Sequence, residues 1–514
     1  MIHKGRSINE KFILRSKDGA ISVSGNASAE FGYRMGSGES EADDGVWVDW
    51  AWGNDRFELK NDRLGLYPMF YHRDRNGFGV SNAIADLIGS GCSTELDDAA
   101  IAVFLRLGFY LGNDTPFKAI RALPPGAVLS WGSNGFRLES AALRSESSRA
   151  SLPPRAAVEA YGELFQSAIE KFVTGENEKV ALPLSGGRDS RQILFALLKA
   201  NRRPDSCITV MPIPPRSEDD AAIASEVARF DKMNHVVLPQ AADLLGMELE
   251  KNRLTNFCAD EHAWILPLRI YLNKHSFTSV FDGIGGDVLV TDVELNRERL
   301  RLYAKSDLRE LAEDILGPEG YLPNMIRPDS YAKWGRELAV EHLIPELEKY
   351  RGSPNPIGQF YFWTRTRREI AASPWGILND PCHVFAPYLS KEVFAFLAAL
   401  PASYLLDRDF RTEAIARYYP EHAHLPYETE GLPPTRIDRK RIAGYASDAA
   451  RYCLFPGGSR KHANASFFLP RIAKGLLNVA YGTNLHALFN KAVYLTQLEE
   501  LRDGLARKEQ APNT

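Results

Sequence analysis

The segment Leu184-Ser185-Gly186-Gly187-Arg188-Asp189-Ser190 combines residue types that suit phosphate binding. Its glycines let backbone N–H groups converge on one anion, and a helix starting there would add its positive dipole. The two serines can donate hydroxyl hydrogen bonds, while Asp189 can cap the helix or hold Mg²⁺ on phosphate oxygens. The GxxxxGK[ST] spacing of a P-loop is absent. The segment predicts a phosphate site of another kind, and its alternative is an ordinary Ser/Gly turn with Asp189 as a helix cap.

The elements around this segment predict how it is positioned. Residues 180–184 read as a short buried strand, and residues 190–200 as a helix with one apolar face. Further along, strands are expected at 206–211, 235–238 and 278–282, with a helix at 218–230. Strands that alternate with helices indicate an α/β fold with a parallel sheet covered on both faces. Residues 295–400 are expected to be mostly helical, and the remainder helical with loops.

A second glycine-rich segment, Phe281-Asp282-Gly283-Ile284-Gly285-Gly286-Asp287, follows the last of these strands. In a doubly wound sheet, ligands bind at the carboxyl ends of the strands, where both segments would lie. Taken alone, this segment is better explained as a plain glycine-rich turn.

Residues 1–140 are expected to be β-rich. Residues 46–52 and 57–60 alternate in polarity around a Gly-Asn-Asp turn, which predicts a hairpin. Residues 69–71 and 78–80 form a similar pair around Asn76-Gly77, a dipeptide that tolerates positive φ. Residues 140–155, rich in Ser, Arg and Pro, are expected to be an exposed linker. The predicted domains are therefore 1–150 and 156–514.

Composition limits the class of protein. The 514 residues are 44% hydrophobic and 25% charged, as in soluble globular proteins of two to three domains. The net charge of −4 gives no basic excess, so we expect no nucleic acid and no anionic membrane as partner. Five widely spaced cysteines without a CxxC argue against disulfides and zinc. No signal peptide or membrane span is recognisable, and a cytoplasmic location is expected.

The SGGxDS pattern after a strand resembles the pyrophosphate loop of the N-type ATP pyrophosphatases, and the second segment resembles the SGxGxD segment of the asparagine synthetase family. In the N-terminal third, Asp62-Arg63-Leu64-Gly65 with Pro68 and Tyr71 is similar to the family's RDxxGxxPLYY segment. Phe78-Gly79-Val80-Ser81-Asn82 and Leu123-Pro124-Pro125-Gly126 are similar to its LxFASE and LPPGH segments. The resemblance covers residues 46 to about 430.

This resemblance implies a degenerate glutaminase-like (Ntn-type) β-rich domain and an adenylating domain with a parallel sheet and many helices. It implies ATP with Mg²⁺ as cofactors, cleaved to AMP and pyrophosphate. The metal-binding residues would be Asp189 and Asp287. The nucleotide-binding residues it implies are Leu184, Ser185, Gly186, Gly187, Asp189, Ser190, Val210, Asp282 and Gly283.

The sequence also departs from the family pattern. Family amidotransferases use a cysteine at position 2, where this chain has Ile2, and its first cysteine is Cys92. We therefore expect no hydrolysis of glutamine. Ile284 stands where the β-lactam-forming branch has a Tyr. Glu369, in Arg365-Thr366-Arg367-Arg368-Glu369, is the candidate base, and Arg411 and Lys440 are candidates for the family's late cation.

The predicted function is that of an ATP-dependent ligase that adenylates a carboxylate and joins it to an amine. The leading case is macrolactam formation in a lasso-type peptide, as in branches of the family that lack the glutaminase. The substrate would be a small molecule or a peptide, and the partners a precursor peptide and a processing protease. Two alternatives stay open. One is an ammonia-dependent asparagine synthetase-like amidotransferase, and the other is a pseudoenzyme scaffold that binds a nucleotide or peptide.

Overall fold

A computed structural model describes twelve stretches of the chain: residues 10–17, 20–35, 44–140, 152–172, 178–211, 219–290, 294–380, 382–406, 409–427, 439–454, 462–477 and 489–503. The expected boundary near residue 150 falls in 141–151, outside these residues. The division into domains at that point therefore stays a prediction.

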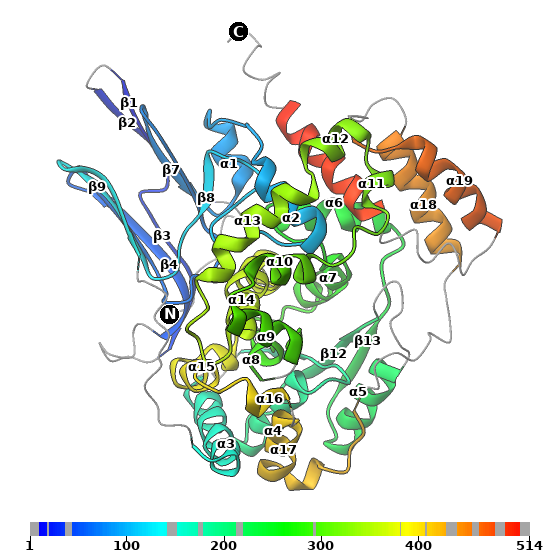
Figure 1. Cartoon of the computed structure of the whole chain (residues 1–514). Helices are drawn as coiled ribbons and strands as arrows, with labels where there is room; N and C mark the ends of the chain where they lie inside the picture. Colours follow the sequence, from blue (N-terminus) through cyan, green and yellow to red (C-terminus); the bar gives the residue numbers. More distant parts are fainter. Residues whose placement is uncertain are drawn as a thin grey trace.

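The β-rich part consists of two antiparallel sheets of five strands each (Figure 1). One sheet has the order β2-β1-β7-β6-β8, with β1 Lys11–Lys17, β2 Ala20–Gly25, β6 Phe70–Asp74, β7 Gly77–Ser81 and β8 Ile120–Ala122. The other has the order β10-β9-β5-β4-β3, with β3 Ser28–Met35, β4 Asp44–Gly53, β5 Arg56–Asn61, β9 Ala127–Gly132 and β10 Gly135–Ser140. Two helices, α1 Ile84–Gly89 and α2 Asp98–Leu107, lie between strands in the sequence.

The two sheets pack face to face through aromatic side chains. In β5 every second side chain is buried, which directs Phe57 and Leu59 inward. Phe57 stacks on Phe12 of the other sheet, with ring centroids 4.3 Å apart, and also contacts Phe78. The predicted hairpin is confirmed, because Trp52 pairs with Phe57 across β4 and β5.

The second part contains a five-stranded parallel sheet with the order β13-β12-β11-β14-β15. Its strands are β11 Val180–Pro183, β12 Ser206–Val210, β13 His235–Leu238, β14 Ser279–Phe281 and β15 His383–Phe385. The chain moves outward from β11 to β13 and then returns to the other side of β11 with β14. The predicted parallel sheet is confirmed. Strand β15, within the stretch expected to be mostly helical, was not predicted.

Helices surround this sheet and fill the rest of the molecule (Figure 1). Those between its strands are α4 Asp189–Lys199, α5 Asp219–Phe230, α6 Leu244–Leu254, η1 Ala263–Ile265, α7 Leu266–Lys274, α8 Gly286–Val290, α9 Arg297–Lys305, α10 Leu308–Leu316, α11 Leu322–Met325, α12 Pro328–Lys333, α13 Arg336–Glu348, α14 Pro356–Tyr361, η2 Phe362–Ile370 and η3 Ser373–Leu378. The others are α3 Pro154–Lys171, η4 Pro387–Leu389, α15 Lys391–Ala398, α16 Ser403–Leu406, α17 Phe410–Tyr418, η5 Pro420–His422, α18 Arg439–Leu454, α19 Ala465–Leu477 and a helix over residues 489–503.

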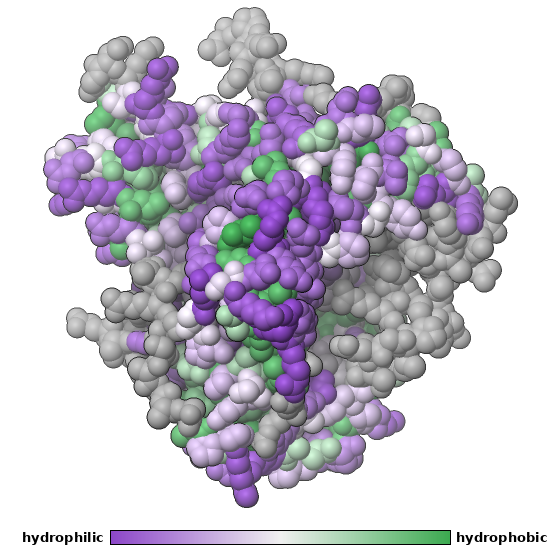
Figure 2. All heavy atoms as spheres, in the orientation of Figure 1, coloured by the Kyte–Doolittle hydropathy of each residue, from purple (hydrophilic) through white to green (hydrophobic). Residues whose placement is uncertain are grey.

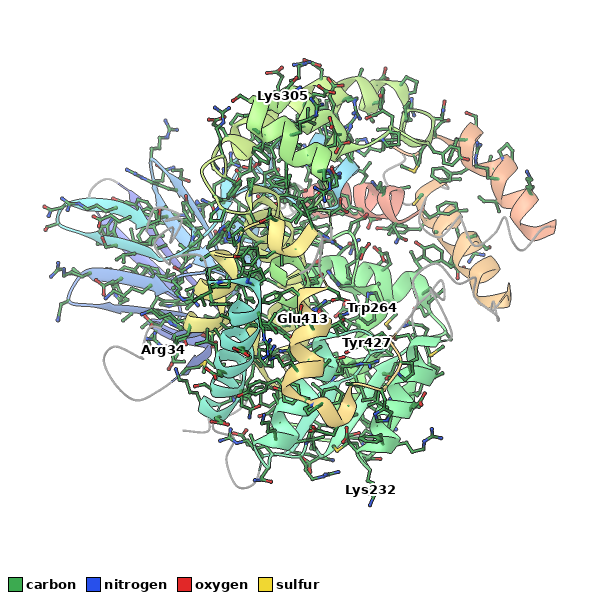
Figure 3. The ribbon with its side chains drawn as sticks, turned by 60° about the horizontal axis from the view of Figure 1, so that its bottom comes forward. Arg34, Lys232, Trp264, Lys305, Glu413 and Tyr427 are labelled. Carbon is green, nitrogen blue, oxygen red and sulfur yellow. The ribbon has the colours of Figure 1, made fainter. Side chains whose placement is uncertain are left out.

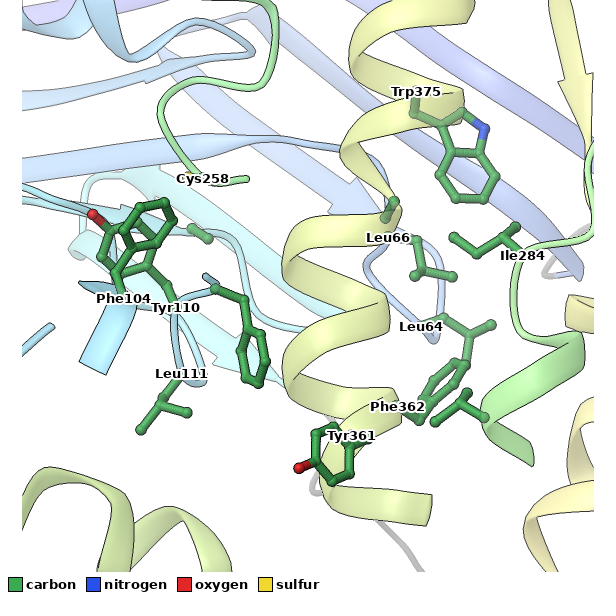
Figure 4. Packing of buried hydrophobic residues seen from close by; sticks show 14 of the residues in the cluster. Leu64, Leu66, Phe104, Tyr110, Leu111, Cys258, Ile284, Tyr361, Phe362 and Trp375 are labelled. Carbon is green, nitrogen blue, oxygen red and sulfur yellow. The ribbon is translucent and has the colours of Figure 1, made fainter. Parts of the chain in front are cut away.

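One apolar cluster joins the β-rich part to the helical part. It includes Leu64 and Leu66 from the first and Ile284, Phe362 and Trp375 from the second (Figure 4). The face of the molecule in Figure 2 is mostly hydrophilic, with hydrophobic residues in small patches. Within the described residues, no helix combines the length and apolar character that a membrane crossing requires.

Two arginines of the π-helix η2 also form hydrogen bonds between the helical part and the β-rich part. The buried Arg367 guanidinium donates to the carbonyl oxygens of Gly112 at 2.9 Å and Leu123 at 2.6 Å, and burial lowers its pKa to about 9. Arg368 donates to the carbonyl of Asp114 at 2.6 Å. These bonds hold η2, which carries Glu369, against the β-rich part.

Candidate functional site

Both glycine-rich segments lie where the strand order of the parallel sheet reverses. Residues 184–188 follow β11, and residues 282–285 follow β14, its direct neighbour. In open parallel sheets this switch point forms the crevice in which ligands bind. The prediction that both segments lie at the carboxyl ends of strands in this sheet is therefore confirmed.

The first segment is a compact loop that opens α4. The Ser190 hydroxyl accepts the Ser185 N–H at 2.9 Å and lies 3.0 Å from the Ser185 hydroxyl. The Ser185 hydroxyl in turn accepts the Gly187 N–H at 3.2 Å. Leu184, only 2% exposed, is fixed by bonds to Ile208 and Thr209 of β12. Val210, 8% exposed, ends β12 at this same edge of the sheet.

One residue at this loop was missed by the sequence analysis. The Asp220 carboxylate, on α5, accepts the Gly186 N–H at 2.5 Å. The Asp220 carboxylate occupies this N–H, so an anionic ligand would have to displace Asp220 in order to use it. Asp220 lies within the helix expected at 218–230, and nothing local in the sequence links it to a loop 34 residues earlier.

Asp189 lies at the centre of the arrangement. Its carboxylate forms an ion pair with Arg411 of α17. A methyl group on Gly283 would lie 2.8 Å from the Asp189 Cβ, and one on Gly286 would collide with the Asp189 carboxylate. The Tyr388 hydroxyl donates to the Asp189 carbonyl at 3.3 Å. The second segment therefore packs directly on Asp189, at a distance that only glycine permits.

Arg411 is a buried cation, 5% exposed. Burial is the main cause that lowers the pKa of its guanidinium, to about 10. Its Nε is buried and has no hydrogen-bond partner in the described part of the chain. Arg411, one of the two candidates for the late cation, therefore lies at the loop. Lys440 is in α18, but its side chain is outside the described residues, as are residues 428–438.

The second segment contains two acidic residues, Asp282 and Asp287, of which the first is the more buried. The Asp282 carboxylate accepts the Ile284 N–H at 2.8 Å, and burial raises the pKa of this carboxyl to about 6. Asp287 is exposed and accepts the Val288 N–H at 2.7 Å. Asp189 and Asp287 come from adjoining segments. Within the described stretches, no group of three or more His, Cys, Asp or Glu residues could hold a metal ion.

Glu369 lies on η2 within a cluster of charged groups. It is 2% exposed, and the guanidinium of Arg365, one turn earlier, donates to it at 3.3 Å. Burial is the main cause that raises the pKa of the Glu369 carboxyl, to about 8. The negative charges of Glu261 and Asp260 raise it further, and Arg365 opposes them. Asp287 acts electrostatically on Arg365, which links this cluster to the second segment.

Two arginines at the loop make cation–π contacts with the ring of Tyr427. The guanidinium of Arg191 lies 4.2 Å from the ring centroid of Tyr427, and that of Arg188 lies 4.8 Å from it. Arg191 also donates to the carbonyl of Gly186 at 2.9 Å, and Arg188 pairs with Asp409 at 2.7 Å. Figure 3 shows Tyr427 beside α17. Arg188 and Arg191 thus tie the loop to the segments around α17.

Gly286→Ala is expected to destabilise the protein by about 1–3 kcal/mol, because its methyl group would displace Asp189 or Tyr388. The matched control is Gly444→Ala in α18, where a methyl group would meet no atom within 4 Å. The control should be neutral or stabilising by up to about 1 kcal/mol. Urea unfolding measures both changes, and equal stability of the two variants would contradict the close packing at Asp189.

The five cysteines are all buried. Burial raises the thiol pKa of Cys92 and of Cys258 to about 11. Burial also raises the thiol pKa of the other three, Cys207, Cys382 and Cys453. Because thiolate is the nucleophile, none of them is activated. We expect a thiol reagent to label the native protein slowly and the denatured protein at all five positions. A cysteine labelled within seconds at neutral pH would contradict this.

Residues 33–141 match the family described as a glutamine amidotransferase domain. Among solved structures, a glutamine phosphoribosylpyrophosphate (PRPP) amidotransferase from B. subtilis, complexed with ADP and GMP, is 12% identical. The likeness has a TM-score of 0.13 and covers 31% of this chain and 31% of that chain. No curated protein matches. The family match indicates an amidotransferase-type domain within residues 33–141 of the β-rich part.

Proposed function

We propose that this amidotransferase-type domain accompanies an ATP-dependent amide-forming ligase, which adenylates a carboxylate, releases pyrophosphate and joins the carboxylate to an amine. The observation that carries the proposal is the convergence of residues 184–190, Asp282–Asp287 and Arg411 at the switch point of the parallel sheet. Macrolactam formation within a peptide is the leading case, since it needs no glutaminase.

The residues at this site suit the binding of a nucleoside triphosphate. The Gly186 and Gly187 N–H groups lie at the start of α4, where the helix dipole favours an anion, and a phosphate would take them over from Asp220 and the Ser185 hydroxyl. Arg411 adds a buried positive charge whose Nε donor has no partner within the described residues. ATP would supply the adenylyl group, and Mg²⁺, held by Asp189 and Asp287, would neutralise phosphate charge. Arg411 would then exchange its contact with Asp189 for a phosphate oxygen.

Glu369 is suited to the second half of the reaction. An attacking amine is protonated at neutral pH and must lose a proton as it adds. A carboxyl with a pKa near 8 holds a proton and releases it close to neutral pH, which is where a general base is most effective. Arg365 positions this carboxylate through their hydrogen bond.

Binding of a non-cleavable nucleotide tests the proposal without knowledge of the substrate. α,β-Methylene-ATP with Mg²⁺ should bind at one site by calorimetry, and inorganic pyrophosphate should compete with it. Ser190→Ala, which removes the hydroxyl that organises Ser185, should weaken binding by roughly ten-fold. Absence of nucleotide binding, or binding that pyrophosphate leaves unchanged, would overturn the proposal.

The domain match favours a second candidate, an ammonia-dependent amidotransferase. Buried cysteines with raised thiol pKa values give no support to glutamine hydrolysis within the chain, so the ammonia would come from elsewhere. The two functions differ in the nitrogen donor. Product formation that requires ammonium chloride, with no product from a peptide that carries its own amine, would favour the amidotransferase.

A further inference from the structure

A second group of charged residues lies outside the candidate site, around a cavity of about 140 Å³. The cavity is lined by residues of α2, of the end of α10 and the turn after it, of α11 and of the helix over 489–503, drawn in red in Figure 1. None of its lining residues belongs to the segments at the switch point. A cavity of about 150 Å³ holds one benzene molecule, so this cavity has room for a small ligand.

Lys491 is a cation of this wall whose charge has no partner. Tyr494, one turn later, stacks on Phe104 of α2 with ring centroids 4.4 Å apart, which holds the helix over 489–503 against α2. The Lys491 Nζ donates to the main-chain carbonyl of Leu105, which also lines the cavity. No carboxylate in the described part of the chain pairs with this ammonium. An ammonium has three N–H donors, so Lys491 can still donate to a ligand.

The carboxylate among the lining residues, Glu319, is occupied by other groups. Arg106 donates to its two oxygens at 2.7 and 2.9 Å. Arg336 donates to it at 3.2 Å, and the Tyr331 hydroxyl at 2.8 Å. Two guanidinium groups therefore already balance the single negative charge of Glu319, and Lys491 adds a further positive charge to the same wall.

The electrostatics of Lys491 lead to the same conclusion. Burial is the main cause that lowers the pKa of its ammonium. Arg106 lowers it as well, whereas the carboxylates of Asp260 and Glu319 raise it without forming an ion pair with Lys491. Desolvation of a charge that lacks a partner costs free energy, and a bound anion would offset this cost. The surroundings of Lys491 therefore favour a negatively charged ligand.

The rest of the wall is apolar and selects the kind of anion. Leu105, Leu322 and Met325 line the cavity with buried side chains, and Leu316 and Pro318 add to this surface. Inorganic phosphate would place charged oxygens against these side chains, where no donor meets them, and such burial is costly. A carboxylate at the end of a short apolar chain directs its oxygens to Lys491 and its carbon atoms to the apolar wall.

We propose that this cavity binds a small monocarboxylate with a short apolar chain, the carboxylate accepting from the Lys491 ammonium and the chain packing against Leu322 and Met325. This goes beyond the proposed ligase activity, because it assigns a carboxylate site outside the reaction centre. The binding needs no nucleotide, so the two proposals can fail separately.

Methyl resonances of the full chain, labelled with ¹³C-methyl methionine, test this site. The probe is isovalerate, and Met325→Leu identifies the Met325 signal among the seven methionines. We expect a saturable shift of that signal with isovalerate. Isovaleramide has nearly the same shape without the charge and should bind at least roughly ten-fold more weakly. An unmoved Met325 signal, or equal binding of the acid and the amide, would overturn the proposal.

Lys491→Met removes the charge and should weaken isovalerate binding by roughly ten- to hundred-fold, while the weak binding of isovaleramide stays unchanged and shows that the cavity is intact. Lys118→Met is the matched control, because Lys118 is an exposed cation that pairs with Glu95 at 2.6 Å, and it should leave isovalerate binding unchanged. Inorganic phosphate should bind more weakly than isovalerate. Tighter binding of phosphate, or unchanged binding of isovalerate to Lys491→Met, would contradict a carboxylate site at Lys491.

Discussion

Asp189→Asn is expected to reduce ATP turnover by at least about 10²- to 10³-fold, the cost of removing one preorganised electrostatic group from a reaction centre. Asp189 pairs with Arg411, packs against Gly283 and Gly286 and is the proposed metal ligand nearest the loop. The amide keeps the shape of the side chain but removes its charge. Turnover is followed as release of pyrophosphate.

Stability must be separated from catalysis in this variant. Removing one partner of a buried ion pair costs about 3–5 kcal/mol, and the cost here should be smaller because the Asp189 side chain is 26% exposed. The double variant Asp189→Asn/Arg411→Met removes the unpaired charge and should recover stability without recovering turnover. Recovery of turnover in the double variant would show that Asp189 serves only to balance Arg411.

Asp409→Asn is the matched control. Asp409 pairs with Arg188 of the same loop at 2.7 Å, but its side chain is 47% exposed. Exposed pairs contribute about 0–1 kcal/mol, so turnover should stay within a few-fold of the wild type. If Asp189→Asn were equally active, Asp189 would be a structural residue.

Glu369→Gln is expected to slow amide formation by about 10²- to 10⁴-fold, the usual contribution of a general base. ATP–pyrophosphate exchange should be largely retained, because Glu369 lies on η2 and not on the loop that opens α4. Glu346→Gln is the control, since Glu346 is also buried, at 6% exposure, and lies on α13. Loss of exchange together with amide formation would assign Glu369 to the fold or the nucleotide site.

The pH dependence follows from the raised pKa of the Glu369 carboxyl. The base form accumulates as the pH rises through about 8, so the rate of amide formation should rise there and Glu369→Gln should lose this step. The contribution of the Glu369 carboxyl to folding stability changes in the opposite direction, falling as the pH rises. The folded protein binds the proton more tightly than the unfolded chain, whose value is near 4.5, so this contribution is full below pH 4.5 and is lost as the pH rises through about 8.

The local parts of the candidate site were predictable from the sequence, and its long-range contacts were not. The strand, the glycine-rich turn and α4 follow each other directly, so hydrophobic pattern and turn residues located the loop. The contact of Arg411 with Asp189 joins residues 222 positions apart, and that of Asp220 with Gly186 depends on how α5 packs. Both arise from tertiary structure, which spacing alone does not encode.

The missed strands have a different cause. In β2 every side chain is exposed, so the apolar alternation that marks a half-buried strand is absent. β15 has only three residues and is defined by pairing with β14.

The products of ATP consumption test the central claim most directly. With a peptide or small-molecule substrate present, ³¹P NMR follows which phosphorus species appear in step with the amide. The proposal that the loop at the carboxyl end of β11 binds pyrophosphate predicts AMP and pyrophosphate in equal amounts, and their loss in Asp189→Asn. ADP and inorganic phosphate formed in step with the amide would contradict the account.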